Sequence, residues 1–281
     1  MAEVINSLWI GRPLSLLEQL SITSFLQNGY EYHLYCYDEV ANVPRGTVLC
    51  DAAEILPASE IFYYRRGPGK GSVAVFTDLF RLKILFEKGG WWVDTDVVCL
   101  RRFDFAEPIV FASERTQTGT QVANAVLKFP QGHAVASLCY EAASRENGAD
   151  LTWGKIGPSL IDRIVRENGL QQFVKLPEVF CPIDWWDWER LLTKNANPPR
   201  QLFTNESYAI HLWHEMWRRR GIKLDSKTGE PRPDFLDALW QRLGLKPKPV
   251  RSGTSPIAEL LRRYGLKRNL EISPASPSDR A

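Results

Sequence analysis

Apolar residues at the start of the chain follow the spacing of strands and helices in turn. Strands are predicted at residues 4–10, 30–37 and 47–50. Between the first two, residues 14–26 carry apolar side chains at helical spacing and end near Asn28-Gly29, a common helix stop. Strands that alternate with a helix through short connections favour a parallel sheet covered by helices.

Elements of both kinds continue beyond residue 60. The basic, Gly- and Pro-rich segment YRRGPGKG at residues 64–71 is predicted to be a loop, and Ser72 is suited to cap the helix after it. Helices are predicted at residues 72–88, 132–146, 158–167, 213–220 and 234–243, and strands at 91–100, 108–112 and 206–212. We therefore expect one large domain, residues 1–245, followed by an extension, residues 246–281.

The extension differs from the domain in composition. It opens with a linker rich in Lys and Pro, and residues 257–266 fit a short basic amphipathic helix. Residues 273–281 are rich in Ser and Pro and are expected to be disordered.

Two acidic residues interrupt the strongly apolar strand WWVDTDVVCL. A carboxylate inside an apolar strand is costly unless something compensates it. Alternate residues of a strand face the same side, so Asp94 and Asp96 are expected to project together. Two oxygen ligands on one side suit Mg²⁺ or Mn²⁺, which keep open positions for water and phosphate oxygens. In the alternative interpretation, both aspartates lie in an exposed turn at the end of the strand.

Residues just upstream favour a metal site over an exposed turn. Gly89-Gly90 forces a tight turn before the strand, and Asp78 and Arg81 lie at positions i and i+3 of the preceding helix, hence on one face. An ion pair on the helix surface would add little stability. Beside an acidic site, Arg81 would instead orient a carboxylate or neutralise a phosphate.

These residues together resemble a known family. FTDLFRLKILFEKGGWWVDTDVVCL, residues 76–100, resembles the DxxR…GG…DxD core of the family 32 glycosyltransferases, which also occurs in the glucosylating domains of clostridial toxins and in α-1,4-galactosyltransferases. A weaker likeness extends over residues 4–215. The resemblance implies an α/β fold of GT-A type, a Rossmann-like mixed sheet flanked by helices, with helical additions toward the C-terminus. It also implies a UDP-sugar donor, a divalent metal (Mn²⁺ or Mg²⁺) and retention of anomeric configuration.

The same resemblance implies roles for individual residues. Asp96 corresponds to the metal-binding carboxylate, and Asp94 to the one that reaches the ribose and the transferred sugar, with a contact to the metal through water. Asp78 and Arg81 correspond to the pair that contacts donor hydroxyls, and with Asp94 they are the expected catalytic residues. Trp9 corresponds to an aromatic that stacks on uracil, although packing in the core is an equally good interpretation.

A further metal ligand is expected late in the chain. His211, in YAIHLWH, resembles the His of the HxW closing segment of this family, and its imidazole suits Mn²⁺ better than Mg²⁺. His214 is the rival, one helical turn further on. Asn124 offers a donor and an acceptor to sugar hydroxyls, although it would equally cap a helix or loop.

Two other segments are candidates for the pocket wall. Gly157-Pro158 either brings backbone close to a ligand or simply begins a helix. The cluster Trp185, Trp186 and Trp188 forms either an acceptor platform or a packing cluster.

Composition limits the partners and the setting. The 281 residues carry a formal charge of +2, which gives no global field for nucleic acid. The five cysteines include no CxxC pair and are expected to be reduced thiols. We find no signal peptide and no apolar run near the ~18 residues of a membrane span, so a cytoplasmic protein is expected. Contact of the basic helix with the inner membrane surface is left open.

The predicted reaction is transfer of a hexose from a UDP-sugar to a saccharide or glycolipid hydroxyl, as in polysaccharide biosynthesis. Two alternatives are a metal-dependent nucleotidyltransferase, which would release pyrophosphate instead of UDP, and a non-catalytic carbohydrate-binding protein.

Overall fold

The computed structural model describes residues 3–11, 13–146, 151–191, 203–222 and 241. The helix predicted at 234–243 falls outside these ranges except for residue 241. The extension predicted at 246–281 lies wholly outside them.

A six-stranded mixed sheet forms the centre of the molecule, in the order β3-β2-β1-β4-β7-β6. Its strands are β1 (Val4–Trp9), β2 (Glu31–Cys36), β3 (Val48–Asp51), β4 (Gly90–Val93), β6 (Val110–Thr116) and β7 (Gly119–Phe129). The strands from β3 to β4 run parallel, and β7 is antiparallel to both of its neighbours. A second, two-stranded sheet pairs β5 (Val97–Cys99) with β8 (Ala209–His211) in antiparallel fashion.

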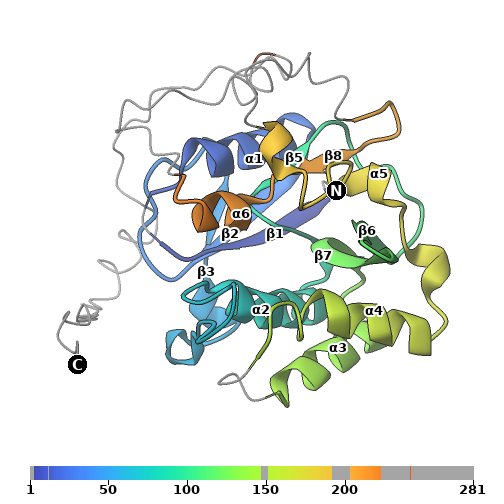
Figure 1. Cartoon of the computed structure of the whole chain (residues 1–281). Coiled ribbons are helices and arrows are strands. Elements are labelled where there is room, and N and C mark those ends of the chain that lie inside the picture. The colour runs from blue at the N-terminus through green and yellow to red at the C-terminus, as the bar shows by residue number, and fades with distance from the viewer. Residues whose placement is uncertain (1–2, 12, 147–150, 192–202, 223–240, 242–281) are drawn as a thin grey trace, which may run out of the picture.

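Helices cover both faces of the large sheet (Figure 1). One layer holds α1 (Leu16–Gln27), α5 (Pro177–Phe180) and α6 (His214–Arg219), and the other holds α2 (Ala74–Glu87), α3 (Ala134–Ser144) and α4 (Pro158–Glu167). Short 3-10 turns lie at Ala52–Glu54, Ala58–Glu60, Gln171–Phe173 and Trp188–Leu191. The α/β fold predicted from the sequence, a mixed sheet flanked by helices, is confirmed.

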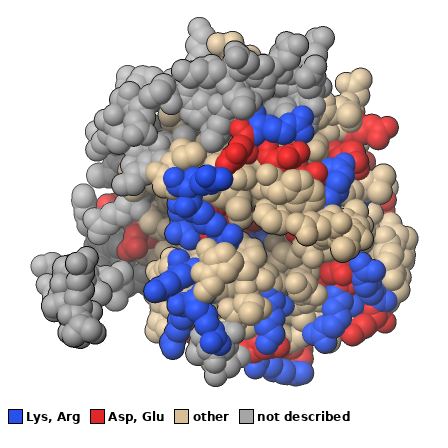
Figure 2. Space-filling view, viewed as in Figure 1, with Lys and Arg blue, Asp and Glu red and all other residues tan. Residues whose placement is uncertain are grey.

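Alternation along β4 divides the core into two layers. Trp91 and Trp92 are neighbours in sequence and both are fully buried, but they belong to the hydrophobic clusters on opposite faces of the sheet. None of the helices in the described ranges is long and apolar enough to cross a bilayer. Side chains of both charge signs occur on the face seen in Figure 2, in keeping with the formal charge of +2.

The single strand predicted at 91–100 is wrong: residues 94–96 form a turn that separates β4 from β5, and the two strands belong to different sheets. The reason is that helix α1 supplies hydrogen bonds to β5. The Ser21 hydroxyl donates to the carbonyl of Val97 (2.6 Å), and Ser24 Oγ accepts from the amide of Cys99 (2.8 Å). These bonds satisfy backbone groups that would otherwise need a neighbouring strand.

Two smaller differences concern β7 and the start of α2. Sequence patterning gave no strand over Gly119–Phe129, yet β7 is the 11-residue partner of both β4 and β6. Asn124 therefore lies within a strand, and its interpretation as a helix or loop cap is wrong. Helix α2 begins after Val73, which makes no capping bond through its side chain, and Ser72 Oγ accepts from the amide of Ala74 (3.3 Å).

Candidate active site

The acidic pair lies on the turn at the carboxyl end of β4. The amide of Asp94 donates to the carbonyl of Ala125 on β7 (2.9 Å), and the amide of Val97 closes the turn on the carbonyl of Asp94 (3.0 Å). This edge of the sheet is where open α/β folds bind ligands. The two carboxylates are thus brought together by a turn and not by the alternation of one strand.

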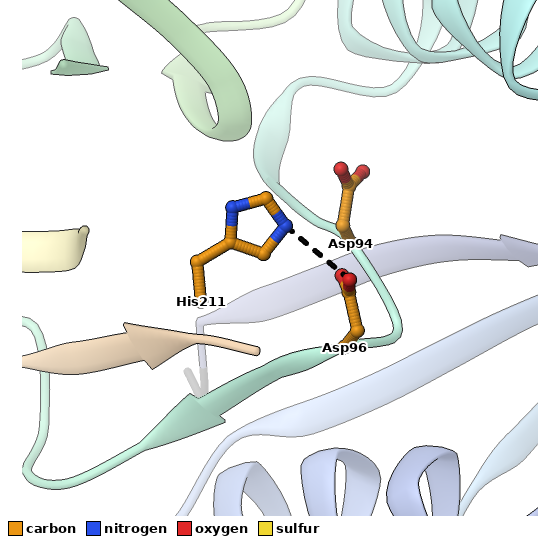
Figure 3. A group of neighbouring side chains, drawn as sticks. All are labelled: Asp94, Asp96 and His211. Carbon is orange, nitrogen blue, oxygen red and sulfur yellow. Dashed lines mark ion pairs between the residues drawn. The ribbon is translucent and has the colours of Figure 1, made fainter. Parts of the chain in front are cut away.

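Pairing of β5 with β8 carries a third polar group to the turn. Val97 lies opposite His211, and the amide of Leu212 donates to the carbonyl of Asp96 (2.9 Å). The Nε2 atom of His211 is 3.3 Å from Oδ2 of Asp96, and Figure 3 shows the imidazole facing both carboxylates. Asp94, Asp96 and His211 each present one ligand atom, and the three atoms lie within 4.8 Å of one another.

The chemistry and spacing of this group fit a divalent cation. Carboxylate oxygens suit Mg²⁺ and Mn²⁺, and an imidazole nitrogen suits Mn²⁺. Opposite ligands on an ion with bonds of about 2.1 Å are about 4.2 Å apart, so the three groups need only a small approach to share one ion.

Strong electrostatic coupling links the members of the group. Burial raises the pKa of Asp96, but the His211 imidazole and the amide of His214 outweigh it and hold that pKa at about 2. Burial lowers the pKa of His211, but the Asp96 carboxylate outweighs it, so that the pKa lies well above its ordinary value. The ring and the carboxylate therefore form an ion pair, and a metal ion would replace the proton of the ring.

The other histidine of this segment has a different partner. Nδ1 of His214 is 3.0 Å from Oε1 of Glu18, a fully buried carboxylate on α1, while the backbone amide of His214 donates to Oδ2 of Asp96 (2.8 Å). The geometry favours His211 as the ligand and gives His214 the task of fixing Asp96 through its amide.

Arg81 forms the wall behind the acidic turn. Its side chain is buried, with Nη2 3.3 Å from Oδ1 of Asp78 and Nη1 3.1 Å from Oδ1 of Asp94. It also donates to the carbonyl of Asn124 and lies over the ring of Trp92 at 5.2 Å, and Trp92 Nε1 donates to Asp94 (2.7 Å). The interpretation of Asp78 and Arg81 as an exposed surface pair is therefore wrong.

Asp78 is enclosed between a strand and a helix start. Asn124 Nδ2 donates to Oδ1 of Asp78 (2.7 Å), and Gly157 begins α4 directly beside both. A Cβ at Gly157 would lie 2.5 Å from Oδ2 of Asp78 and 2.6 Å from Nδ2 of Asn124, so glycine is required for this close approach. Burial raises the pKa of Asp78 to about 6, although Arg81 offsets part of the effect.

Sequence reasoning missed Glu114, on β6. Gln121, its partner on β7, donates to Oε1 of Glu114 (2.6 Å), and burial raises the pKa of this carboxyl while Gln121 and His211 lower it. The sequence offers one indication of this site, an acidic residue shortly before the turn between β6 and β7, and that hairpin is not predicted from the sequence.

Trp9 lies at the carboxyl end of β1 and is partly buried against the core on the α1 side. Its Nε1 atom is buried and has no hydrogen-bond partner among the described residues. The position is compatible both with stacking on a base and with packing in the core.

Comparison with known proteins finds two family models that match parts of the chain. Residues 63–115, which contain Asp94-Thr95-Asp96, match the glycosyltransferase sugar-binding region containing a DXD motif, and residues 128–229 match the alpha 1,4-glycosyltransferase conserved region. Both matches are to glycosyltransferase regions, and together they include the acidic turn and His211. The resemblance of residues 76–100 to the DXD-containing glycosyltransferases is confirmed, and Asp94, Asp96 and His211 form a candidate divalent-metal site.

Curated relatives match part of the chain. It is 28% identical over 169 residues to lactosylceramide 4-alpha-galactosyltransferase of Homo sapiens, covering 55% of this chain and 45% of that protein. It is 25% identical over 167 residues to the same enzyme of Mus musculus, with coverage of 55% and 45%. It is 27% identical over 155 residues to alpha-1,4-N-acetylglucosaminyltransferase of Homo sapiens, with coverage of 50% and 43%. The chain spans about half the length of these relatives.

Solved structures give more distant matches. PaToxG glycosyltransferase aligns at a TM-score of 0.44 and 14% identity, covering 86% of this chain and 84% of that one. The UDP-bound glycosyltransferase domain of the YGT toxin aligns at a TM-score of 0.43 and 10% identity, covering 62% and 79%.

Proposed function

We propose that this protein is a glycosyltransferase that moves a hexose from a UDP-sugar to a hydroxyl of a saccharide or glycolipid, with retention of configuration and with Mn²⁺ or Mg²⁺ as cofactor. The observation that carries the proposal is that Asp94, Asp96 and His211 place ligand atoms within 4.8 Å of one another, beside an arginine that orders Asp94. The names of the relatives support α-transfer of galactose or N-acetylglucosamine, and in one case a glycolipid acceptor. Retention rests on the family resemblance.

Different residues of the site would bind the metal, orient a carboxylate and stack on the base of the donor. Asp94, Asp96 and His211 would hold the divalent ion, which when bound neutralises charge on the departing diphosphate. Arg81 keeps the Asp94 carboxylate in one orientation, so that little reorganisation is needed when substrate arrives. Trp9 lies at the end of β1, its Nε1 has no hydrogen-bond partner among the described residues, and its ring would stack on uracil.

A second set of polar groups would receive the sugar. Asn124 and Asp78 are joined by a hydrogen bond, and Asp78 is also paired with Arg81. A carboxylate that already has fixed partners on one side keeps its remaining lone pairs for sugar hydroxyls. This arrangement would select the donor sugar by hydroxyl orientation, because a mismatched hydroxyl would leave a buried polar group unpaired.

The test is metal-dependent breakdown of the donor. Purified chain is incubated with UDP-galactose, UDP-glucose and UDP-N-acetylglucosamine, with Mn²⁺, with Mg²⁺ or with EDTA, and both UDP and pyrophosphate are measured. We expect release of UDP that requires the metal and that is lost in Asp96→Asn. Release of pyrophosphate would favour nucleotidyl transfer, and release of neither product with any donor would contradict the proposal.

A further inference from the structure

Two adjacent tryptophans are exposed on the segment between α5 and the 3-10 turn Trp188–Leu191. Trp185 is 40% exposed and Trp186 39%, and their rings meet edge to face with centroids 5.5 Å apart and an interplanar angle of 82°. Trp188, the third member of the cluster in the sequence, is buried and packs against Trp217 at 6.1 Å. The structure thus separates one packing residue from a pair that faces solvent.

Contacts with the site hold this segment in place. The carbonyl of Ile183 accepts from Nε1 of Trp213 (2.9 Å), and the ring of Trp213 lies 3.9 Å from the ring of His211. Asp184 is paired with Arg115 on β6 (3.0 Å) and its carbonyl accepts from the amide of Asp187 (2.9 Å). The tryptophan pair is therefore connected to His211 through two loop residues, Ile183 and Asp184, and the ring of Trp213, which supports a position at the rim of the site.

The exposure of this pair is not explained by folding. Neither ring belongs to the two hydrophobic clusters of the core, and adjacent exposed indoles are costly to keep in water. Trp153, which is exposed to a similar extent, has partners within the protein, since Tyr64 stacks on it at 5.0 Å and Arg219 lies over it at 4.4 Å.

We propose that Trp185 and Trp186 form the acceptor subsite and stack against the saccharide whose hydroxyl receives the hexose. This inference rests on the proposed function. One face of a pyranose ring carries several C–H groups, and an aromatic face is negative and flat, so the two surfaces attract each other. Two rings at 82° form a corner that contacts a sugar on two sides and fixes its orientation.

Fixing the orientation of the acceptor matters for the chemistry. The acceptor oxygen bonds to C1 of the hexose while the bond from C1 to the diphosphate oxygen breaks. UDP leaves with the electron pair, and the hydroxyl proton goes to its phosphate oxygen. An acceptor stacked at the rim places one chosen hydroxyl toward C1, which is how the subsite would set the linkage formed.

A glycan array measures the subsite without requiring turnover. The full chain, with Mn²⁺ and UDP, is applied to an array of galactose-, glucose- and N-acetylglucosamine-terminated oligosaccharides. The wild type is compared with the double variant Trp185→Ala/Trp186→Ala, the double variant Trp185→Phe/Trp186→Phe, and Tyr63→Ala, which removes another exposed aromatic side chain. Circular dichroism confirms that each variant is folded.

We expect the wild type to bind a defined set of saccharides, the alanine pair to lose at least about tenfold of that signal, and the phenylalanine pair and Tyr63→Ala to retain most of it. Equal binding by the wild type and the alanine pair, or no saccharide bound by the wild type, would overturn the assignment. Metal-dependent UDP release is measured on the same samples. Its absence in the wild type counts against the proposed function, whereas normal UDP release with unchanged glycan binding rejects the tryptophan subsite alone.

Discussion

Replacement of Arg81 by methionine is expected to destabilise the protein strongly, because the guanidinium is the cation between two carboxylates. Arg81 is 3% exposed and Asp78 6%, and Arg81 also reaches Oδ1 of Asp94 at 3.1 Å. Methionine keeps much of the aliphatic stem and removes the charge. Removal of one partner from a buried ion pair costs about 3–5 kcal/mol, because the remaining charge is left without compensation.

The pH dependence of this effect distinguishes charge from packing. Burial raises the pKa of Asp78 from 3.8 to about 6, with Arg81 offsetting part of the rise. Because the folded pKa is above the unfolded one, this carboxyl contributes stability that is fully present below about pH 3.8 and is lost as the pH rises through about 6. The rise of the Asp78 pKa from 3.8 to about 6 corresponds to a loss of about 3 kcal/mol in the free energy of unfolding. Without Arg81 the pKa of Asp78 in the folded protein rises further, so the free energy of unfolding continues to fall above pH 6.

Urea unfolding at pH 5 and pH 8, followed by tryptophan fluorescence, measures this difference. We expect Arg81→Met to be less stable than the wild type at both values, with a deficit at least about 1 kcal/mol larger at pH 8. Arg81→Lys keeps the charge but not the two-pronged guanidinium contact, so its free energy of unfolding should lie between those of Arg81→Met and the wild type. In the double variant Asp78→Asn/Arg81→Met, part of the loss at pH 8 should be recovered. An equal deficit at both pH values would refute the electrostatic argument and leave packing of Arg81 on Trp92 as the cause.

Three further substitutions test the site. Asp96→Asn should abolish metal-dependent UDP release while the circular dichroism spectrum is unchanged, and wild-type rates at saturating Mn²⁺ would contradict the assignment. Trp9→Ala should weaken UDP binding by roughly 1–3 kcal/mol in calorimetry if the indole stacks on uracil. An unchanged affinity would mean that Trp9 only packs in the core. Gly157→Ala should raise the KM for the donor and lower the melting temperature, because its Cβ would lie 2.5 Å from Asp78 Oδ2. Ser159→Ala, on the exposed side of the same helix, serves as the control, and equal behaviour of the two variants would argue against a close approach at Gly157.

Much of the fold follows from local patterns in the sequence. The β-α-β opening was predicted because the strand and helix periods are clear there, and α1 begins with a capping box in which Ser15 Oγ accepts from Leu17 and Glu18 accepts from Ser15. Asp78 and Arg81 were placed on one face from their spacing alone, and the structure pairs them at 3.3 Å.

What the sequence did not show depends on contacts between distant segments. The split of β4 from β5 depends on α1 and on β8, which lies far along the chain, so no local pattern reveals it. The contact of Glu18 with His214 is of the same kind: locally Glu18 is only a capping residue, and its second partner comes from the start of α6. Glu114 was missed because its burial and its bond to Gln121 require the β6–β7 hairpin, whose second strand has few β-branched residues.

We expect Asp94, Asp96 and His211 to hold one divalent cation together with the donor. Electron paramagnetic resonance of Mn²⁺ titrated into the full chain with UDP present tests this claim most directly. We predict one bound Mn²⁺ per chain, with coupling to an imidazole nitrogen that disappears in His211→Ala. Bound Mn²⁺ without nitrogen coupling, or no bound Mn²⁺ at all, would contradict the three-ligand site.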